Sequence, residues 1–443
     1  MRTLDYWEGR LTAVPSTIEC AEMRLLSSHD HEPPIFVGPG YIDIRSSTAI
    51  DFTMFATPSD DRDAIRRLVR ARENPYEVFE QFRLVATDYQ GTEWACGWTR
   101  PELKGMPKVG WPLTGGLSSL VTHASGPWVS TEPGVELVFR PKVWLPMDKS
   151  MMTVTSVDGT EIQRRHSAGQ QTVQVLDSEI KFFYTPSDES LWLTAKVSDK
   201  LRHPYAENWL SEPLRVLLGQ LVFPRLVARN FGDGTAQVWL RPSPHHFKPS
   251  VASLLGEDAL GAGAKFWEIY KSLLTLIAEA RDDQGQPNFE SHRITRFYEE
   301  IIQATQGSRW VLCMTLASAA EGLVRMLLPP GNRRKVDTYM KTLVQRGVLV
   351  DDNQWSWTTV RHAVMHGQLV SPWATEDEDK RLLDLADLVH RLTRELIRGG
   401  VEEKEESPLI SKEGTPDAAG PDRGDERPVG GENQKSSDGR ETY

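Results

Sequence analysis

An arginine and two histidines stand close together near residue 360, and their types and spacing suit chemistry on a phosphodiester. The stretch reads Arg361-His362-Ala363-Val364-Met365-His366-Gly367. An imidazole titrates near neutral pH and can take or give a proton, and a guanidinium stays charged and holds phosphate oxygens. RNA supplies its own nucleophile, the 2′-hydroxyl. The set therefore suits RNA cleavage without a metal ion.

Helical geometry decides which of these side chains can act together. His362 and His366 are four residues apart, so on a helix they share a face. Arg361 and His366 are five apart, about 140° around an ideal helix and about 7.5 Å along it. They cannot pair side by side, but both can approach one phosphate. The same spacing recurs elsewhere, as in Arg241 and His246, so the spacing alone does not identify a site. The prediction depends on the position of Arg361 and His366 in the helical part of the chain.

Glu321 is a second candidate, because it lies in a nearly all-apolar segment, where an unpaired carboxylate would be costly. It has two interpretations. It could orient Arg361, or it could form an ordinary ion pair with Arg325, four residues further on. The sequence leaves both open.

The elements that must position these residues are helices. From about residue 260 the apolar residues recur with a period of 3.6, which predicts an antiparallel bundle over 258–399. We expect helices at 264–281, 291–306, 308–328, 332–346 and 376–398, with a short helix that ends near His366-Gly367. Thr375 and Glu378 have capping-box spacing, and Gly399-Gly400 should end the last helix.

Residues 1–248 alternate with period two and predict an antiparallel β sandwich or barrel-like domain. Clear strand patterns occur at 41–45, 51–55, 135–139, 171–175, 179–183 and 190–194, with helical insertions at 61–72 and 207–229. Residues 400–443 form a third part. From residue 401 on it carries twelve acidic and six basic residues and one aromatic residue, Tyr443, so we expect a disordered acidic tail. The fold class is thus α+β, with several domains.

Composition limits the function further. The chain has 443 residues and a formal net charge of −11. This charge excludes a protein that coats nucleic acid through a generally basic surface. Its three cysteines, Cys20, Cys96 and Cys313, have no metal-ligand spacing, and the N-terminus lacks the apolar core of a signal peptide. The most apolar stretch is interrupted by Glu321 and Arg325. We expect a cytoplasmic protein without cofactor, metal or membrane partner.

The helical part resembles the HEPN superfamily, through Arg361-x4-His366 with His362 after the arginine and through Ala319-Ala320-Glu321-Gly322-Leu323. The overall layout is similar to ApeA-type defence proteins, with a weak likeness at Tyr6-Trp7-Glu8-Gly9-Arg10-Leu11. This resemblance implies a metal-independent endoribonuclease in an antiviral or toxin-like role. Arg361 and His366 would be catalytic and His362 would assist. It also implies a homodimer through the helical domain, with a β-rich domain that senses an unknown trigger.

Other functions fit the same residues. The helical part could be a non-catalytic binding or dimerisation domain, since a helix-end arginine and histidine are often structural. A metal site at His362 and His366 is a weaker alternative, because the glutamate of a zinc-binding HExxH motif is missing. The Trp-rich β domain could bind a carbohydrate or a peptide, although its tryptophans also suit a core.

Overall fold

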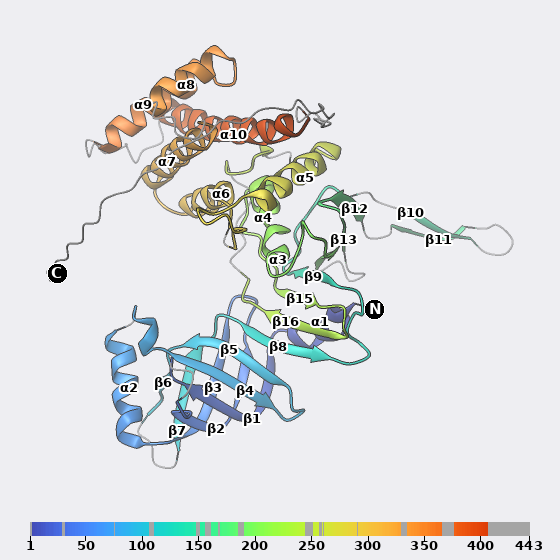
Figure 1. Cartoon of the computed structure of the whole chain (residues 1–443), viewed down its shortest axis with the longest axis vertical. Coiled ribbons are helices and arrows are strands. Elements are labelled where there is room, and N and C mark those ends of the chain that lie inside the picture. Colours follow the sequence, from blue (N-terminus) through green and yellow to red (C-terminus); the bar gives the residue numbers. More distant parts are fainter. Residues whose placement is uncertain are drawn as a thin grey trace, which may run out of the picture.

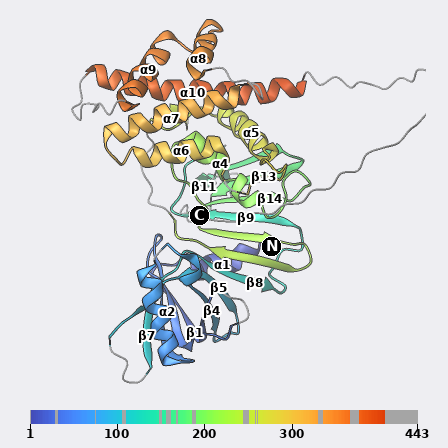
Figure 2. The ribbon, with the colours of Figure 1, turned by 60° about the vertical axis from the view of Figure 1, so that its left-hand side comes forward.

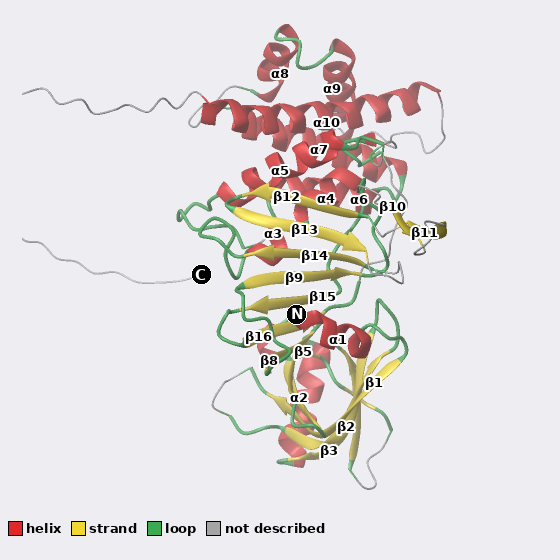
Figure 3. Ribbon diagram, turned by 90° about the vertical axis from the view of Figure 1, so that its right-hand side faces the viewer, coloured by secondary structure: helices red, strands yellow, loops and turns green. Residues whose placement is uncertain are grey.

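The computed structural model has a large antiparallel sheet in its N-terminal part and a helical region in its C-terminal part (Figures 1 and 3). It describes residues 2–28, 32–74, 76–105, 110–147, 151–155, 161–166, 169–184, 190–243, 251–256, 259, 261–289, 291–328, 335–365 and 376–405.

The main sheet has 14 strands in the order β12-β13-β14-β9-β15-β16-β8-β5-β4-β1-β2-β3-β7-β6. Its strands are β1 Ser16–Leu26, β2 Phe36–Ile44, β3 Ile50–Pro58, β4 Phe82–Asp88, β5 Glu93–Thr99, β6 Glu102–Leu103, β7 Trp111–Gly116, β8 Leu120–Ser125, β9 Gly134–Phe139, β12 Gln170–Val175, β13 Ser178–Tyr184, β14 Leu191–Lys196, β15 Leu226–Asn230 and β16 Thr235–Leu240. A separate hairpin consists of β10 Met151–Thr155 and β11 Glu161–His166. All six strand patterns identified in the sequence lie in strands of this sheet.

The sheet has two regions joined at a narrow seam. β5 and β8 meet through one residue pair, Ala95 and Val121. On one side of the seam the strands from β5 to β7 curl, and the Thr99 hydroxyl donates to the carbonyl of Gly116 at 2.9 Å across the two ends of the curl. This region is therefore barrel-like, whereas β9 and β12–β16 form a more open layer (Figure 3).

In strands with one solvent-exposed face, buried and less buried residues alternate with the predicted period of two. Alternate residues of β4 are buried, as expected for a half-buried strand. All six residues of β9 are buried instead. Helix α1 (Thr3–Leu11) contributes to this burial: Glu136 on β9 accepts the backbone N–H groups of Thr3 and Leu4, both at 2.9 Å. A carboxylate suits a helix N-terminus, whose first N–H groups lack helical partners.

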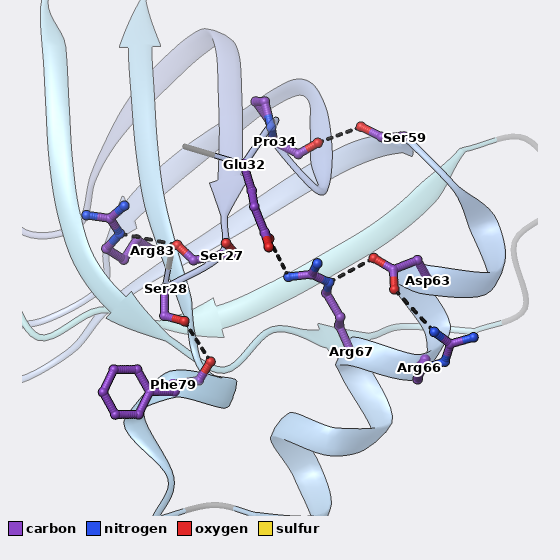
Figure 4. A network of polar contacts seen from close by, with 10 residues as sticks. All are labelled: Ser27, Ser28, Glu32, Pro34, Ser59, Asp63, Arg66, Arg67, Phe79 and Arg83. Atoms are coloured by element: carbon purple, nitrogen blue, oxygen red, sulfur yellow. Dashed lines mark hydrogen bonds and ion pairs between the residues drawn. The ribbon is translucent and has the colours of Figure 1, made fainter. Parts of the chain in front are cut away.

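Helix α2 (Asp61–Glu73) lies outside the curled strands and confirms the first predicted helical insertion. The side chain of Asp60 caps it by accepting the N–H of Asp63 at 2.9 Å. Figure 4 shows Arg67 reaching between two carboxylates, Glu32 at 2.9 Å and Asp63 at 2.8 Å. The pair with Asp63 lies within the helix, and the pair with Glu32 attaches the helix to the segment between β1 and β2.

The second predicted helical insertion, over 207–229 with a kink or an end at Pro224, is confirmed only in its first half. The chain forms two short helices, α3 (Ala206–Trp209) and α4 (Glu212–Leu218), and then strand β15. Gly219 ends α4 with φ of +61°, a left-handed conformation that favours glycine. Residues 226–230 pair with both β9 and β16, so tertiary pairing overrides the helical pattern there.

The helical region contains six further helices among the described residues. They are α5 Ala264–Glu279, α6 Arg293–Ala304, α7 Arg309–Leu327, α8 Val336–Gln345, α9 Asp351–Met365 and α10 Glu376–Glu405. The predicted helices are confirmed to within a few residues at most ends, although α9, which was predicted to be short, has 15 residues. The exception is α10, which continues through Gly399-Gly400 to Glu405 because good helix formers follow the glycine pair. Thr375 lies outside the described residues, so the capping box stays a prediction.

The β layer and the helices share one hydrophobic core. A single cluster of buried residues runs from β9 and β12–β14 through α3 and α4 into α5, α6, α7 and α10, and α4 lies between the strands and α6 (Figure 2). Polar contacts cross the same boundary. Trp267 on α5 donates to the carbonyl of Pro146, and Tyr270 donates to the carbonyl of Leu210. The helical region is therefore anchored to the β layer.

A buried polar network lies between α4 and α6. The Glu212 carboxylate accepts the N–H of His292 and the hydroxyl of Thr295, both at 2.8 Å. Arg215, one turn away, pairs with Glu299 at 2.7 Å. Removing one partner from such a buried set is strongly destabilising, because it leaves a charge without compensation. The network therefore fixes the position of α6 on the β layer.

Helix α7 is long and apolar enough to cross a membrane by length and composition alone. Core helices pass the same test, and α7 packs against α6, α8, α9 and α10. We interpret it as the central helix of the bundle. The three cysteines are buried and form no disulfide with one another.

Two buried histidines predict how stability depends on pH. Burial lowers the pKa of His292 and that of His390 to about 4. The unfolded chain then binds more protons than the folded chain between about pH 6.5 and pH 4. The free energy of unfolding should fall across this window on acidification, on the order of 3 kcal/mol per histidine. Urea denaturation at a series of pH values measures it.

His292→Asn isolates one contribution. His292 caps α6 by accepting the N–H of Ile294, and asparagine caps helices without titrating. This variant should keep its stability near pH 7.5 and lose about half of the acid dependence. His123→Asn, at an exposed position, is the control and should keep the wild-type slope. An unchanged slope in His292→Asn contradicts the prediction.

Candidate functional site

Helix α9 carries the start of the motif, and a tryptophan holds it against α7. Trp357 is only 1% exposed, and its indole N–H donates to the carbonyl of Ala317 at 3.2 Å. A buried indole usually requires such an acceptor. The contact fixes both the position of α9 and its rotation about its own axis.

Helix α10 contacts the same buried face of α9 through two buried polar side chains. The Asn353 amide donates to the carbonyl of Asp384 at 2.9 Å, and the Ser356 hydroxyl donates to the Asp384 carboxylate at 3.0 Å. Each bond satisfies a buried polar group that would otherwise be costly. One face of α9 is thus held against both α7 and α10, with Arg361 one turn beyond Trp357.

Glu321 on α7 contacts two arginines. One carboxylate oxygen lies 3.3 Å from Nε of Arg361, and the other lies 2.7 Å from Nη2 of Arg325. The sequence left open whether Glu321 pairs with Arg361 or with Arg325, and the structure shows both contacts. Glu321 is 23% exposed and Arg361 is 46% exposed, so the carboxylate is sheltered while the Arg361 guanidinium still meets solvent.

Two further groups act on Arg361. Its guanidinium lies 5.0 Å from the ring centroid of Trp357, a cation–π geometry. Asp337 on α8 contributes negative charge. The pKa of Asp337 is lowered first by a hydrogen bond from Lys341 and, to a smaller extent, by the charge of Arg361. Arg361 is therefore oriented by a ring, a carboxylate ion pair and a second, more distant carboxylate.

Small residues let α6 come close to this part of α7. Gly322 follows Glu321, and a Cβ at this position would lie 2.2 Å from the ring of Phe297 on α6. Only glycine allows this approach without a shift of the ring. Gly322 therefore helps to set how α7, and Glu321 with it, lies on α6.

The structure places only part of the predicted set. Arg361 and His362 are exposed near the end of α9, which ends at Met365. His366 and Gly367 lie outside the described residues, so their relation to Arg361 and His362 stays a prediction. What the structure brings together is Arg361 and Glu321, from two helices.

Sequence reasoning missed the role of two residues in this arrangement. The residue pattern assigned no role to Trp357, and it offered Arg325 only as an alternative partner for Glu321. Trp357 and Arg361 are four residues apart on α9, as are Glu321 and Arg325 on α7. Each spacing indicates that the two side chains share a helix face. The sequence did not show that the pair on α9 faces the pair on α7.

Among the described residues, no group of three or more histidine, cysteine or acidic side chains could hold a metal ion. Comparison of the chain with protein-family models, with curated proteins and with solved structures finds no match. The function therefore has to be inferred from the residues themselves.

The two tryptophans of α9 give a matched test of this site. Trp357→Ala removes a buried side chain and its hydrogen bond, so we expect a loss of about 3–5 kcal/mol in the free energy of unfolding. Trp355, two residues earlier, is 57% exposed. Trp355→Ala should cost less than about 1 kcal/mol. Urea denaturation of both variants measures the difference, and equal losses would contradict the assigned role of Trp357.

Proposed function

We propose that the chain is a metal-independent endoribonuclease of the HEPN type, with an antiviral or toxin-like defence role. The observation that supports it best is the ion pair between Glu321 and Arg361 across α7 and α9. It holds a permanently charged and solvent-accessible guanidinium near the helix end that precedes His366. A cation with fixed position next to a titratable imidazole is what phosphodiester cleavage requires.

In this mechanism the 2′-hydroxyl of RNA attacks the adjacent phosphorus. A bond forms from the 2′-oxygen to phosphorus, and the bond from phosphorus to the 5′-oxygen of the next nucleotide breaks. Arg361 stabilises the charge that builds on the phosphate oxygens. The 2′-hydroxyl loses a proton as it attacks and the leaving 5′-oxygen gains one, so the number of protons is unchanged; His366 carries this transfer as base and acid, and His362 assists at the same site. Glu321 is a positioning residue that acts through Arg361.

The partners follow from the same proposal. RNA is the substrate, two copies associate through the helical domain, and the β-rich domain responds to a trigger in the cytoplasm. A surface hollow of about 740 Å³ beside α1 supports the last point. Its lining includes Arg10, His123 and a stacked pair, Tyr6 and Trp128, with ring centroids 4.3 Å apart. Aromatic and polar side chains together suit a small polar ligand.

The alternative is a binding or dimerisation protein without catalysis. The shared core favours this alternative in one respect. The helical bundle buries one side of the β layer, so it stabilises the fold whether or not it is catalytic. In that case Arg361 and Glu321 form only a structural ion pair. The experiments below separate the two functions.

Single substitutions of the motif test catalysis. Arg361→Ala and His366→Ala should each lower the rate of RNA cleavage by about 10²-fold or more, because each removes a group that acts in the transition state. Cleavage of a labelled RNA by the purified full chain measures the rate. Circular dichroism should show unchanged helix content in both variants, since Arg361 is about half exposed. Wild-type cleavage in both would remove the catalytic assignment.

Metal independence gives a second test. Cleavage should proceed at an unchanged rate in the presence of excess EDTA, because the proposed groups supply both the proton transfer and the charge stabilisation. Restoring Mg²⁺ or Zn²⁺ afterwards should have no effect beyond ionic strength. A loss of activity with EDTA that a divalent ion reverses would favour the metal alternative at His362 and His366.

A further inference from the structure

Two arginines converge on one carboxylate at the contact of α7 and α9. We propose that Arg325 and Arg361 together form a binding site for RNA phosphates, in which Arg325 holds a phosphate next to the one that is cleaved. This inference rests on the proposed ribonuclease function for the identity of its ligand. The site itself rests on contacts of the described residues.

The geometry brings the two cations close together. Arg325 Nη2 lies 2.7 Å from one oxygen of Glu321, and Arg361 Nε lies 3.3 Å from the other. Both oxygens are bonded to the same carbon, so the two guanidinium groups flank a single carboxylate. They are thus near enough to contact neighbouring phosphates of one strand.

Exposure and charge show that the arrangement can take an anion. Arg325 is 66% exposed and Arg361 is 46% exposed. The two cations and one carboxylate sum to a local charge of plus one, on a chain of formal charge −11. Without a ligand, Glu321 offsets the repulsion between the arginines. An exposed ion pair contributes little to stability, so Arg325 can leave Glu321 for a phosphate, which guanidinium binds with two donors.

The register of the helices places Arg325 on the side of the motif where the chain continues to His366. Ala317 contacts Trp357, and Glu321 contacts Arg361, so the contacts advance by four residues on both helices. One more turn on each helix brings the backbone of Arg325 level with the last residue of α9, at position 365, while its guanidinium reaches back to Glu321. Arg325 is therefore level with the end of the helix and not with its middle. A second phosphate contact there would favour oligonucleotides over dinucleotides.

The test compares Arg325→Gln with Arg346→Gln in the full chain. Arg346 is the matched control, since it is also an exposed arginine of the helical region paired with a glutamate, Glu395. Binding is measured by fluorescence anisotropy with a 2′-O-methyl oligonucleotide, which cannot be cleaved. Arg325→Gln should weaken binding about tenfold at low salt and reduce the slope of log K against log salt by about 0.7. Arg346→Gln should match the wild type.

Cleavage kinetics separate binding from chemistry. Arg325→Gln should raise KM for an oligonucleotide about tenfold, with kcat within about threefold of the wild type, and should change dinucleotide cleavage little. Arg325→Lys should recover part of the loss, because lysine keeps the charge without the bidentate geometry. A purely structural role for Arg325 would produce neither the salt dependence nor the dependence on substrate length.

The outcomes distinguish this site from the nuclease. Wild-type affinity and salt slope in Arg325→Gln, with cleavage lost in Arg361→Ala, overturn the phosphate site and leave the nuclease in place. Wild-type cleavage in both Arg361→Ala and His366→Ala removes the catalytic assignment of these two residues, while a loss of affinity in Arg325→Gln still supports the phosphate site. A full chain that does not bind the oligonucleotide at all overturns the phosphate site.

Discussion

One carboxylate, that of Glu321, connects the two helices on which the candidate site depends. It lies on α7, whose other residues are mostly apolar, and a carboxylate without a partner there would be costly. Arg361 from α9 and Arg325 from α7 satisfy it together. The requirement to pair Glu321 therefore brings cations to this surface, although the chain as a whole is acidic.

The rest of the fold fixes the helices that carry this group. The network of Glu212 and Arg215 sets α6 on the β layer, and Gly322 sets α7 close against α6. Trp357 then sets α9 on α7. Each step is a buried contact with a defined geometry, so packing brings the backbones of Glu321 and Arg361 close enough for the two side chains to pair.

The sequence predicted the parts of this arrangement that depend on local pattern. The strands at 135–139 and 179–183, helix α2 and most helix bounds followed from periodicity. Strand β15 did not, because it pairs with residues far away in the chain. The contact of Glu321 with Arg361 was one of two open alternatives, since spacing along one helix says nothing about a second helix. The place of His366 stays a prediction.

The shared core limits how the β-rich domain could control a site on the helical region. A change in the β-rich domain can alter the site through packed elements only if one of these elements has two stable arrangements. Rearranging the network of Glu212, Arg215 and Glu299 would separate buried charges, which is costly. The geometry around Glu321 is therefore fixed by the fold. Control is easier at the exposed side of Arg325 and Arg361, where a bound partner or a second copy can cover or complete the site without moving a helix.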